Sequence, residues 1–297
     1  MADQKPLVGI FFIIAAFLAY AIMSGFVKAC SLSDLPVQEI IFFQNIFALV
    51  ILLPWLLKAI NGDWLPKNKL LVVSRALLGL LSFYLFFVAV KLVPLVNAVL
   101  LQNTTPFFIP LLALIFFRKK ITLRVWISVM IGFVGVTLVL NPGRGFLRSG
   151  DLIALAAGLM SAITTILVGR LDEKKETIQI ILFYLFTITI LVTGLWSIPN
   201  WQTPLGILWI YLIVSGILYA VFQVFFVMSL KFASATTIAP FIYMVVVFSG
   251  IVDWVVWHQT PGLLTVVGAA VVIGSGIFSA LPNGKRTSTN SVRGRSA

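Results

Sequence analysis

The sequence predicts an all-α membrane protein of about ten transmembrane helices, arranged as two inverted five-helix repeats with both termini in the cytoplasm. Three observations support this fold class. Of the 297 residues, 61% are hydrophobic and 10% are charged, which leaves too few charges for the mixed polar surface of a soluble domain. The apolar residues form long runs, and the second half of the chain repeats features of the first. The runs lack the alternation of a transmembrane β-barrel.

The long apolar runs define the expected helices. A bilayer core about 30 Å thick requires roughly 20 apolar residues per helix, and charged residues, Pro, Gly or Asn separate runs of about that length. The expected helices lie near residues 7–28, 38–58, 70–91, 95–117, 123–141, 150–170, 177–198, 206–230, 234–257 and 262–281. The first run is interpreted as an uncleaved helix, because Lys5 is the only basic residue before it. Residues 177–230 contain no charge, so their division rests on the stretch IPNWQTPLG at 198–206.

The distribution of Lys and Arg predicts the orientation, because positively charged short loops remain on the cytoplasmic side. With a cytoplasmic N-terminus, 17 of the 21 basic residues fall on the inner side. The outer side retains Lys28, Lys91, Arg144 and Arg148. The net charge of +12 is therefore interpreted as a topology signal, and nucleic-acid binding is disfavoured because no continuous basic patch with interleaved aromatics appears. The basic tail 282–297 is expected to be disordered in the cytoplasm, with contact to anionic membrane lipids as the alternative.

Short matches between the two halves predict an internal repeat. The stretch AAFLAYA at 15–21 matches AAGLMSA at 156–162, and AVKLVP at 89–94 matches SLKFAS at 229–234, at separations of 141 and 140 residues. Two repeats with an odd number of helices must lie in opposite orientations, as in secondary transporters with a substrate site near the midplane. The expected domains are residues 1–148, residues 149–281 and the tail 282–297.

Polar residues interrupt the fourth apolar run in the stretch LLQNTTPFFIP at 100–110. A helix starting near residue 95 places these residues at a depth of roughly 10 to 15 Å, near the midplane. Pro106 lacks an N–H and leaves the carbonyl of Gln102 free. Polar groups at this depth must face protein or a water-filled cavity. Gln102, Asn103 and Thr105 are candidate substrate-binding residues. Asn103 could instead hold a neighbouring helix, and hydrogen bonds between helices are the alternative explanation for all three.

Other helices carry polar and aromatic side chains at helical spacing that could line the same site. The further candidate substrate-binding residues are Tyr20, Ser24, Tyr84, Ser161, Thr165, Tyr219, Gln223 and Tyr243. By the repeat, Tyr243 corresponds to Asn103. For each Tyr, core packing with a satisfied hydroxyl is an equal alternative. The glycines of the last run, Gly268, Gly274 and Gly276, suit close helix packing, with a homodimer as a lesser alternative.

The acidic residues constrain the mechanism, because all nine lie in loops or near helix ends. Proton coupling usually requires a buried carboxylate that titrates during transport, so uniport or exchange is expected. Glu39 and Asp253 are the candidate coupling or gating acids, and interfacial charges are the alternative for both. Arg75 could attract an anionic group at the cytoplasmic mouth, with snorkelling to lipid phosphate as the alternative.

Several functional classes are disfavoured by what the sequence contains. It has one cysteine, Cys30, and one histidine, His258, so no cofactor, metal centre or disulfide is expected. An intramembrane enzyme acting on lipid or prenyl substrates remains the alternative function, but it would need clustered acids, His or Cys. A channel is disfavoured because no ring of like side chains appears.

Two long stretches carry a resemblance to a known family. Residues 74–117 with 125–140, and residues 217–254 with 262–278, resemble the EamA-type repeat of the drug/metabolite transporter superfamily. The shared features include an Arg opening the third helix, a Pro inside the fourth and a Gly-rich fifth. The family's usual Glu after helices 4 and 9 is missing from FRKKIT at 117–122 and WHQTPG at 257–262.

The resemblance implies a function. It implies a secondary transporter in the bacterial inner membrane, which moves small organic metabolites by rocking of two inverted halves. The stretches ATTIAPFIYMV at 235–245 and TPLG at 203–206 are similar to a branch that includes S-adenosylmethionine carriers. The expected solutes are S-adenosylmethionine, amino acids or related amphipathic molecules.

Overall fold

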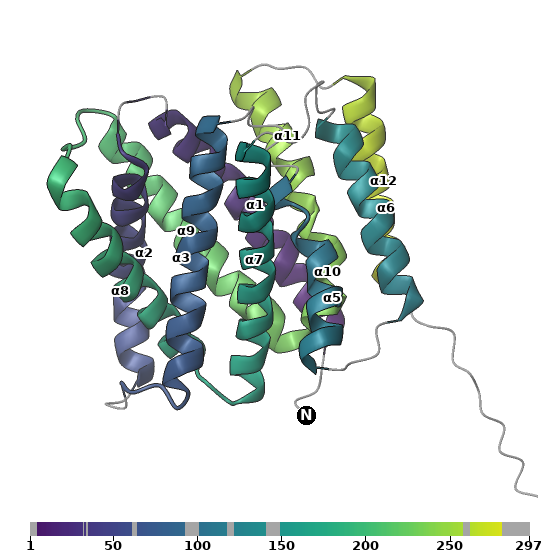
Figure 1. Ribbon diagram of the computed structural model, residues 1–297, viewed down its shortest axis with the longest axis horizontal. Helices are drawn as coiled ribbons and strands as arrows, with labels where there is room; N and C mark the ends of the chain where they lie inside the picture. The colour runs from purple at the N-terminus through teal and green to yellow at the C-terminus, as the bar shows by residue number, and fades with distance from the viewer. Residues whose placement is uncertain are drawn as a thin grey trace, which may run out of the picture.

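The protein is an assembly of helices throughout the part of the chain that the structure describes (Figure 1). In this computed structural model the described residues are 5–31, 33, 35–60, 64–92, 101–117, 122–140, 149–257 and 262–280. Within them, seven stretches are long and apolar enough to cross a membrane, and three shorter apolar helices accompany them. Large hydrophobic side chains such as Leu7, Leu70 and Ile115 are exposed, as expected of helices whose outer faces contact lipid.

The helix bounds follow the apolar runs of the sequence. The first half contains α1 (Pro6–Ser31), α2 (Val37–Ile60), α3 (Lys69–Leu92), α5 (Thr105–Phe117) and α6 (Leu123–Leu140). The second half contains α7 (Ser149–Glu173), α8 (Ile178–Ser197), the 3₁₀ helix η1 (Ile198–Asn200), α9 (Leu208–Phe232), α10 (Ala235–Ile242), α11 (Met244–Trp257) and α12 (Leu263–Ala280). The division expected inside the uncharged stretch 177–230 is confirmed. Gly206 ends that turn with φ of +56°, a conformation that Gly adopts without strain.

Two of the expected helices are interrupted. In the fourth, Asn103 and Thr104 form a turn before α5 begins, and in the ninth a turn at Tyr243 separates α10 from α11. Each break lies within three residues of a proline, which cannot donate a backbone hydrogen bond, and α10 with α11 together still form one candidate membrane span, Ala235–Val256. The carbonyl of Gln102 instead accepts a hydrogen bond of 2.8 Å from the Thr105 hydroxyl, which confirms that it lacks its helical partner.

The closest helix pairs join the two halves of the sequence. α1 packs mainly on α9 and α3 on α7, while α2 packs on α8 and α6 on α12. α1 also packs on α10 and α11, and α5 packs on α7. We call α1, α9, α10 and α11 the α1–α9 bundle, and α3, α5 and α7 the α3–α7 bundle. Figure 1 shows α6 beside α12 at one edge of the molecule. The compact units are therefore mixed bundles rather than the two sequence halves.

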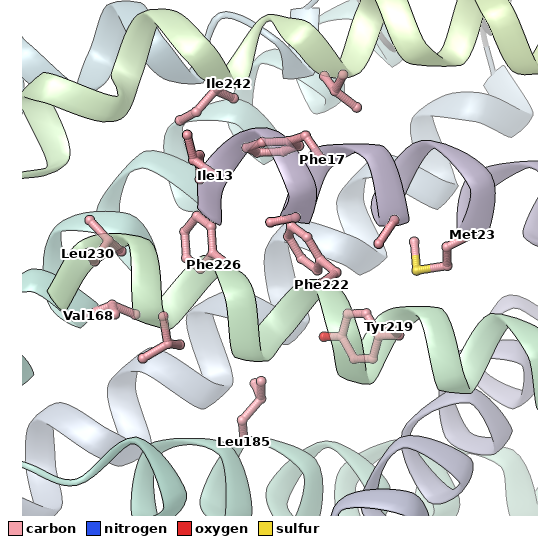
Figure 2. Packing of buried hydrophobic residues seen from close by; sticks show 14 of the residues in the cluster. Ile13, Phe17, Met23, Val168, Leu185, Tyr219, Phe222, Phe226, Leu230 and Ile242 are labelled. Atoms are coloured by element: carbon pink, nitrogen blue, oxygen red, sulfur yellow. The ribbon is translucent and has the colours of Figure 1, made fainter. Parts of the chain in front are cut away.

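The core of the α1–α9 bundle is a continuous apolar contact. Figure 2 shows Ile13 and Phe17 of α1 between Phe222 and Phe226 of α9 on one side and Ile242 of α10 on the other. Phe17 and Phe222 pack with ring centroids 5.7 Å apart. Such well-packed helices are expected to move as one body, because interiors at this density deform little.

The glycines of α12 serve packing inside the chain. A Cβ on Gly276 would lie 3.1 Å from the Phe241 ring, and a Cβ on Gly135 of α6 would lie 2.9 Å from the carbonyl of Gly268. Gly274 has no atom within 4 Å of its Cβ position. The close packing expected from these glycines is thus made between α12 and its neighbours in the same chain.

Hydrogen bonds join connections of the two halves at each end of the molecule. At one end, Lys67 Nζ donates to the carbonyl of Lys175 at 3.3 Å, and the Asn68 N–H donates to Glu176 Oε2 at 3.2 Å. At the other end, the Gln202 N–H donates to Glu39 Oε1 at 2.8 Å. The connection from α2 to α3 therefore lies beside the turn from α7 to α8, and the start of α2 lies beside the segment that leads into α9.

Candidate functional site

A chain of hydrogen bonds crosses the interior between α3 and α9. Arg75 Nη2 of α3 donates to Gln223 Oε1 at 2.9 Å, and Gln223 Nε2 donates to the Tyr219 hydroxyl at 2.8 Å. Each of the three side chains is only 3% exposed. Tyr219 and Gln223 are one helical turn apart, so they share a face of α9. The structure thus joins two predicted substrate-binding residues to the predicted anion-attracting residue.

Arg75 lies deeper than a residue at the cytoplasmic mouth. It follows the start of α3 by six residues, about 9 Å along the helix, and its side chain is turned inward to α9. In the described part of the chain, the structure records no carboxylate at ion-pair distance from it. Its Nε has no hydrogen-bond partner. The Arg75 side chain is therefore buried in the protein and does not extend to lipid phosphate.

Four aromatic rings form a closed set beside the hydrogen-bond chain. Tyr20 and Phe222 lie 5.0 Å apart between ring centroids, Phe222 and Tyr219 6.2 Å, Tyr219 and Phe83 5.6 Å, and Phe83 and Tyr20 6.3 Å. These separations are typical of favourable aromatic pairs. The four rings lie within three residues of the midpoints of α1, α3 and α9. Phe83 and Phe222 are functional candidates that the sequence did not reveal, because they are two among 25 phenylalanines.

The fourth apolar run contributes Gln102 to this set. The Tyr20 hydroxyl lies near the side chains of Gln102 and Ser24, and the Ser24 hydroxyl donates to the backbone carbonyl of Tyr20 at 2.9 Å. We call the four rings together with Arg75, Gln223, Gln102 and Ser24 the central cluster. Its contacts Arg75 to Gln223 and Phe83 to Tyr219 connect the α3–α7 bundle to the α1–α9 bundle.

The remaining polar residues near the break before α5 take part in helix packing. The Thr105 hydroxyl is 3.0 Å from the carbonyl of Gly158 on α7, and a Cβ on Gly158 would lie 2.9 Å from the carbonyl of Gln102. On α7 the Thr165 hydroxyl donates to the carbonyl of Ser161 at 2.9 Å. Asn103 is buried beside them. The contact of Thr105 with Gly158 corresponds to the interhelical alternative that the sequence left open, whereas the Thr165 bond lies within α7.

Two of the predicted tyrosines lie in other surroundings. Tyr84 packs on Trp196 of α8 with ring centroids 4.5 Å apart, and Trp196 is exposed. Tyr243 is fully buried, and a Cβ on Gly132 of α6 would lie 2.5 Å from its ring. Its hydroxyl has no hydrogen-bond partner. Neither residue shares a ring contact or hydrogen bond with the central cluster in the described structure.

Of the two predicted coupling or gating acids, Glu39 and Asp253, the structure describes the side chain of Glu39. Glu39 is completely buried in the first turn of α2; its Oε1 accepts the Gln202 N–H, and its Oε2 has no partner. Asp253 lies in α11, and its side chain is outside the described part. Glu176, which accepts the N–H of Asn68 at the opposite end, was not a candidate from the sequence because it lies among the charged residues of a short loop.

Apolar helices long enough to cross a membrane, with a polar and aromatic cluster buried between two mixed bundles, are an arrangement typical of membrane transporters. The comparison with protein families agrees with this class. The EamA-like transporter family matches residues 7–141 and again residues 148–281. The chain belongs to this family and, with it, to the drug/metabolite transporter superfamily.

The relatives of the chain are bacterial transporters. The pseudopaline exporter CntI of Pseudomonas aeruginosa is 26% identical over 272 residues, covering 89% of this chain and 93% of the exporter. A riboflavin transporter of Vibrio cholerae is 25% identical over 285 residues, 93% of each chain. An S-adenosylmethionine uptake transporter of Rickettsia felis is 24% identical over 240 residues, 81% of each chain. The protein is therefore a multi-pass transporter of the bacterial inner membrane rather than an enzyme.

A solved crystal structure has the same fold. It superposes with a TM-score of 0.76 at 17% sequence identity, and the match covers 92% of this chain and 95% of the other.

Proposed function

We propose that this protein is a secondary transporter that moves small organic metabolites by alternating access, with the central cluster as its substrate site. The observation that carries the proposal is the position of that cluster. Its four rings lie near the midpoints of α1, α3 and α9, and the cluster supplies a hydrogen bond and ring contacts between the two mixed bundles. A site at such an interface can be exposed to either side of the membrane when the bundles tilt.

Packing and end contacts support an inverted repeat of residues 1–148 and 149–281. If the two halves are equivalent, α1 corresponds to α7, α3 to α9, and α5 to α10 with α11. The pair of α1 and α9 then corresponds to the pair of α7 and α3, and both pairs are in contact in the structure. The end contacts indicate opposite directions, because the end of α7 lies beside the start of α3, and the start of α2 lies beside the segment before α9. The two matches to the family are further support.

The moving units in this proposal are the α1–α9 bundle and the α3–α7 bundle. Because α1 is packed more closely on α9 than on its own half, a rocking of the sequence halves would break the largest contacts of the molecule. Tilting of the mixed bundles preserves those contacts. It changes the sparser direct contacts between the bundles, among which the central cluster lies, and it requires α2 and α8, which link α9 to α3, to adjust.

Two buried or half-buried carboxylates serve as gates. Glu39 holds the segment before α9 at one end, and Glu176 holds the segment before α3 at the other. Each accepts a backbone N–H from the opposite half, and the two acids occupy similar places at the starts of α2 and α8. In alternating access the two ends open in turn, so one carboxylate releases its partner while the other holds.

The end held by Glu176 is assigned to the cytoplasm. Lys67, Lys69, Lys174 and Lys175 gather there, in agreement with the excess of positive charge expected on the inner side. With α1 starting at this side, both chain termini are cytoplasmic. The end held by Glu39 then faces outward.

The central cluster contains no acid, so uniport or exchange is the proposed mode. Glu39 and Asp253 are the remaining candidates if a proton is coupled. Relatives that are 24 to 26% identical to this chain are named for chemically different solutes. The proposed range of solutes therefore stays broad: S-adenosylmethionine, amino acids and related amphipathic molecules.

Uptake of a panel of labelled metabolites into proteoliposomes tests the proposal. We expect at least one solute to accumulate or exchange, and Gln102→Leu to reduce its rate about tenfold or more, because the site then loses the polar side chain beside the Tyr20 hydroxyl. A matched control is Gln202→Leu, which keeps the backbone N–H that Glu39 binds. Absence of transport for every solute would refute the proposal, and equal rates for Gln102→Leu and wild type would remove Gln102 from the site.

A further inference from the structure

We propose that Arg75 is the anion-binding residue of the substrate site, so that the transported solute is a small organic acid whose carboxylate binds the guanidinium while its carbon skeleton lies against the four aromatic rings. This inference rests on the proposed transport function and assigns its substrate class. The expected solutes are carboxylates with an apolar or flat skeleton.

The first step is the charge of Arg75. A guanidinium remains protonated under all physiological conditions, and here it is 3% exposed about 9 Å along α3 from the start of the helix. A buried charge is costly unless it is paired with an opposite charge. In the described structure Arg75 has hydrogen bonding to one neutral amide and no ion pair. A residue held this way is prepared for an anion that arrives with the solute.

The second step is the unused capacity of the guanidinium. It carries five N–H donors in a planar fork that fits a carboxylate through two parallel hydrogen bonds. One donor atom, Nη2, binds Gln223 Oε1, whereas the buried Nε has no partner. Donors therefore remain for a ligand while Gln223 fixes the orientation of the group.

The third step is the neutral character of the partner. Gln223 binds Arg75 and Tyr219 at the same time, so it connects the guanidinium to the rings without neutralising it. A Glu at position 223 would form a stronger, charge-assisted pair with Arg75, but it would neutralise the guanidinium charge. The amide therefore leaves Arg75 available for the carboxylate of a solute.

The fourth step is the adjacency of charge and rings. Tyr219 belongs both to the hydrogen-bond chain and to the closed set of rings with Tyr20, Phe83 and Phe222. A solute with a carboxylate next to an apolar skeleton meets both surfaces at once. Phe83 of the α3–α7 bundle contacts Tyr219 and Tyr20 of the α1–α9 bundle in this structure, so binding requires Phe83 to separate from these rings as the bundles tilt.

Matched pairs of acids and amides test the proposal. The probes are phenylacetate with phenylacetamide and hexanoate with hexanamide, which differ in charge while the skeleton is kept. Dissociation constants come from the shift of the thermal unfolding midpoint of the purified full-length protein. We expect wild type to bind at least one acid tenfold or more tightly than its amide, and Arg75→Gln to bind both members of that pair equally. Arg75→Lys should retain part of the preference, because it keeps the charge and loses the fork.

Gln223→Glu separates ligand recognition from a bracing role of Arg75. If Arg75 binds the solute, an internal carboxylate at position 223 competes with the acid, so the preference for the acid is lost while the unfolding midpoint stays equal or rises. If Arg75 only braces α3 against α9, the stronger pair leaves any preference for acids unchanged.

The outcomes that overturn the proposal are defined for each variant. A wild-type protein without preference for any acid over its amide, or a full preference in Arg75→Gln, overturns it. If Arg75→Gln does not fold, a retained preference in Gln223→Glu decides against it. Transport of neutral solutes with no role for Arg75 would refute this inference alone, whereas absence of transport for all solutes would refute the proposed function.

Discussion

At the scale of single residues, polar side chains that could bind a ligand differ from those that only pack helices, because the former keep hydrogen-bond donors without a partner. Arg75, Gln223 and Tyr219 form one connected chain in which donors remain on the guanidinium. The Thr105 and Thr165 hydroxyls instead bond to helix carbonyls, so their capacity is used within the fold. Both groups have similar residue types in sequence, and only the direction of the side chains separates them.

Tyr243→Phe tests this distinction at the most buried of the predicted site residues. The Tyr243 hydroxyl is buried without a partner, and such a group costs about 1 to 3 kcal/mol. Removal of the oxygen should therefore stabilise the protein by about 1 kcal/mol and leave transport unchanged, measured by thermal unfolding and proteoliposome uptake. A loss of uptake with intact stability would return Tyr243 to the substrate site, as the sequence predicted.

At the scale of elements, prolines and glycines determine where the helices break and how closely they approach. The break before α5 lies against Gly158 of α7, where a Cβ would be 2.9 Å from the carbonyl of Gln102 and 3.0 Å from that of Leu101. This approach fixes the position from which Gln102 reaches Tyr20. The corresponding break at Tyr243 lies against Gly132 of α6.

Gly158→Ala should displace the break before α5. The added methyl group overlaps backbone oxygens that cannot move without shifting the helix, so we expect a loss of about 1 to 3 kcal/mol in stability and a reduced uptake rate. The matched control is Gly169→Ala on the same helix, whose Cβ position has no atom within 4 Å; it should behave as wild type or slightly better. Equal stability of the two variants would contradict the packing described here.

At the scale of the whole molecule, the pairing of helices across the repeat determines what can move. Each mixed bundle contains helices from both halves, and the two bundles meet at the central cluster. A hydrogen-bonded carboxylate holds each end. The molecule is therefore suited to two alternative tilts, with the population of each set by the contacts at the ends.

Glu39→Ala and Glu176→Ala should shift that population in opposite directions. The reporter is Ser24→Cys in a Cys30→Ser background, labelled from outside intact cells with a membrane-impermeant thiol reagent. A hydrogen bond to a charged group contributes about 1.5 to 3 kcal/mol to the conformation that contains it. A difference of about 1.4 kcal/mol changes the ratio of two conformations tenfold. We expect Glu39→Ala to raise the labelling rate about tenfold and Glu176→Ala to lower it.

The control for this experiment is Glu173→Ala. Glu173 pairs with Arg170 at 3.7 Å on the exposed surface, and such a pair contributes little, so the labelling rate should not change. Labelling that moves in the same direction in both gate variants, or in neither, would show that the two carboxylates are not opposed gates.

The sequence predicted the elements and some of the residues that form the proposed site. Apolar run length depends on bilayer thickness alone, which is why bounds such as those of α3 and α8 agree with the expected segments within a few residues. The stripe of Tyr219 and Gln223 was identified because helical spacing is local. Tyr84 and Tyr243 were placed in the site with equal justification, yet their surroundings depend on α8 and α6, which no local pattern specifies.

The sequence by itself determined that the chain crosses a membrane, where its helices lie and that its halves are related, because these properties follow from the composition and periodicity of contiguous residues. Only the tertiary structure decided that Arg75 is turned inward to Gln223, that Phe83 and Phe222 complete a set of rings, and that the compact units mix the two halves. The physical reason is that these contacts join residues more than a hundred positions apart, and their free energy depends on which helix faces meet.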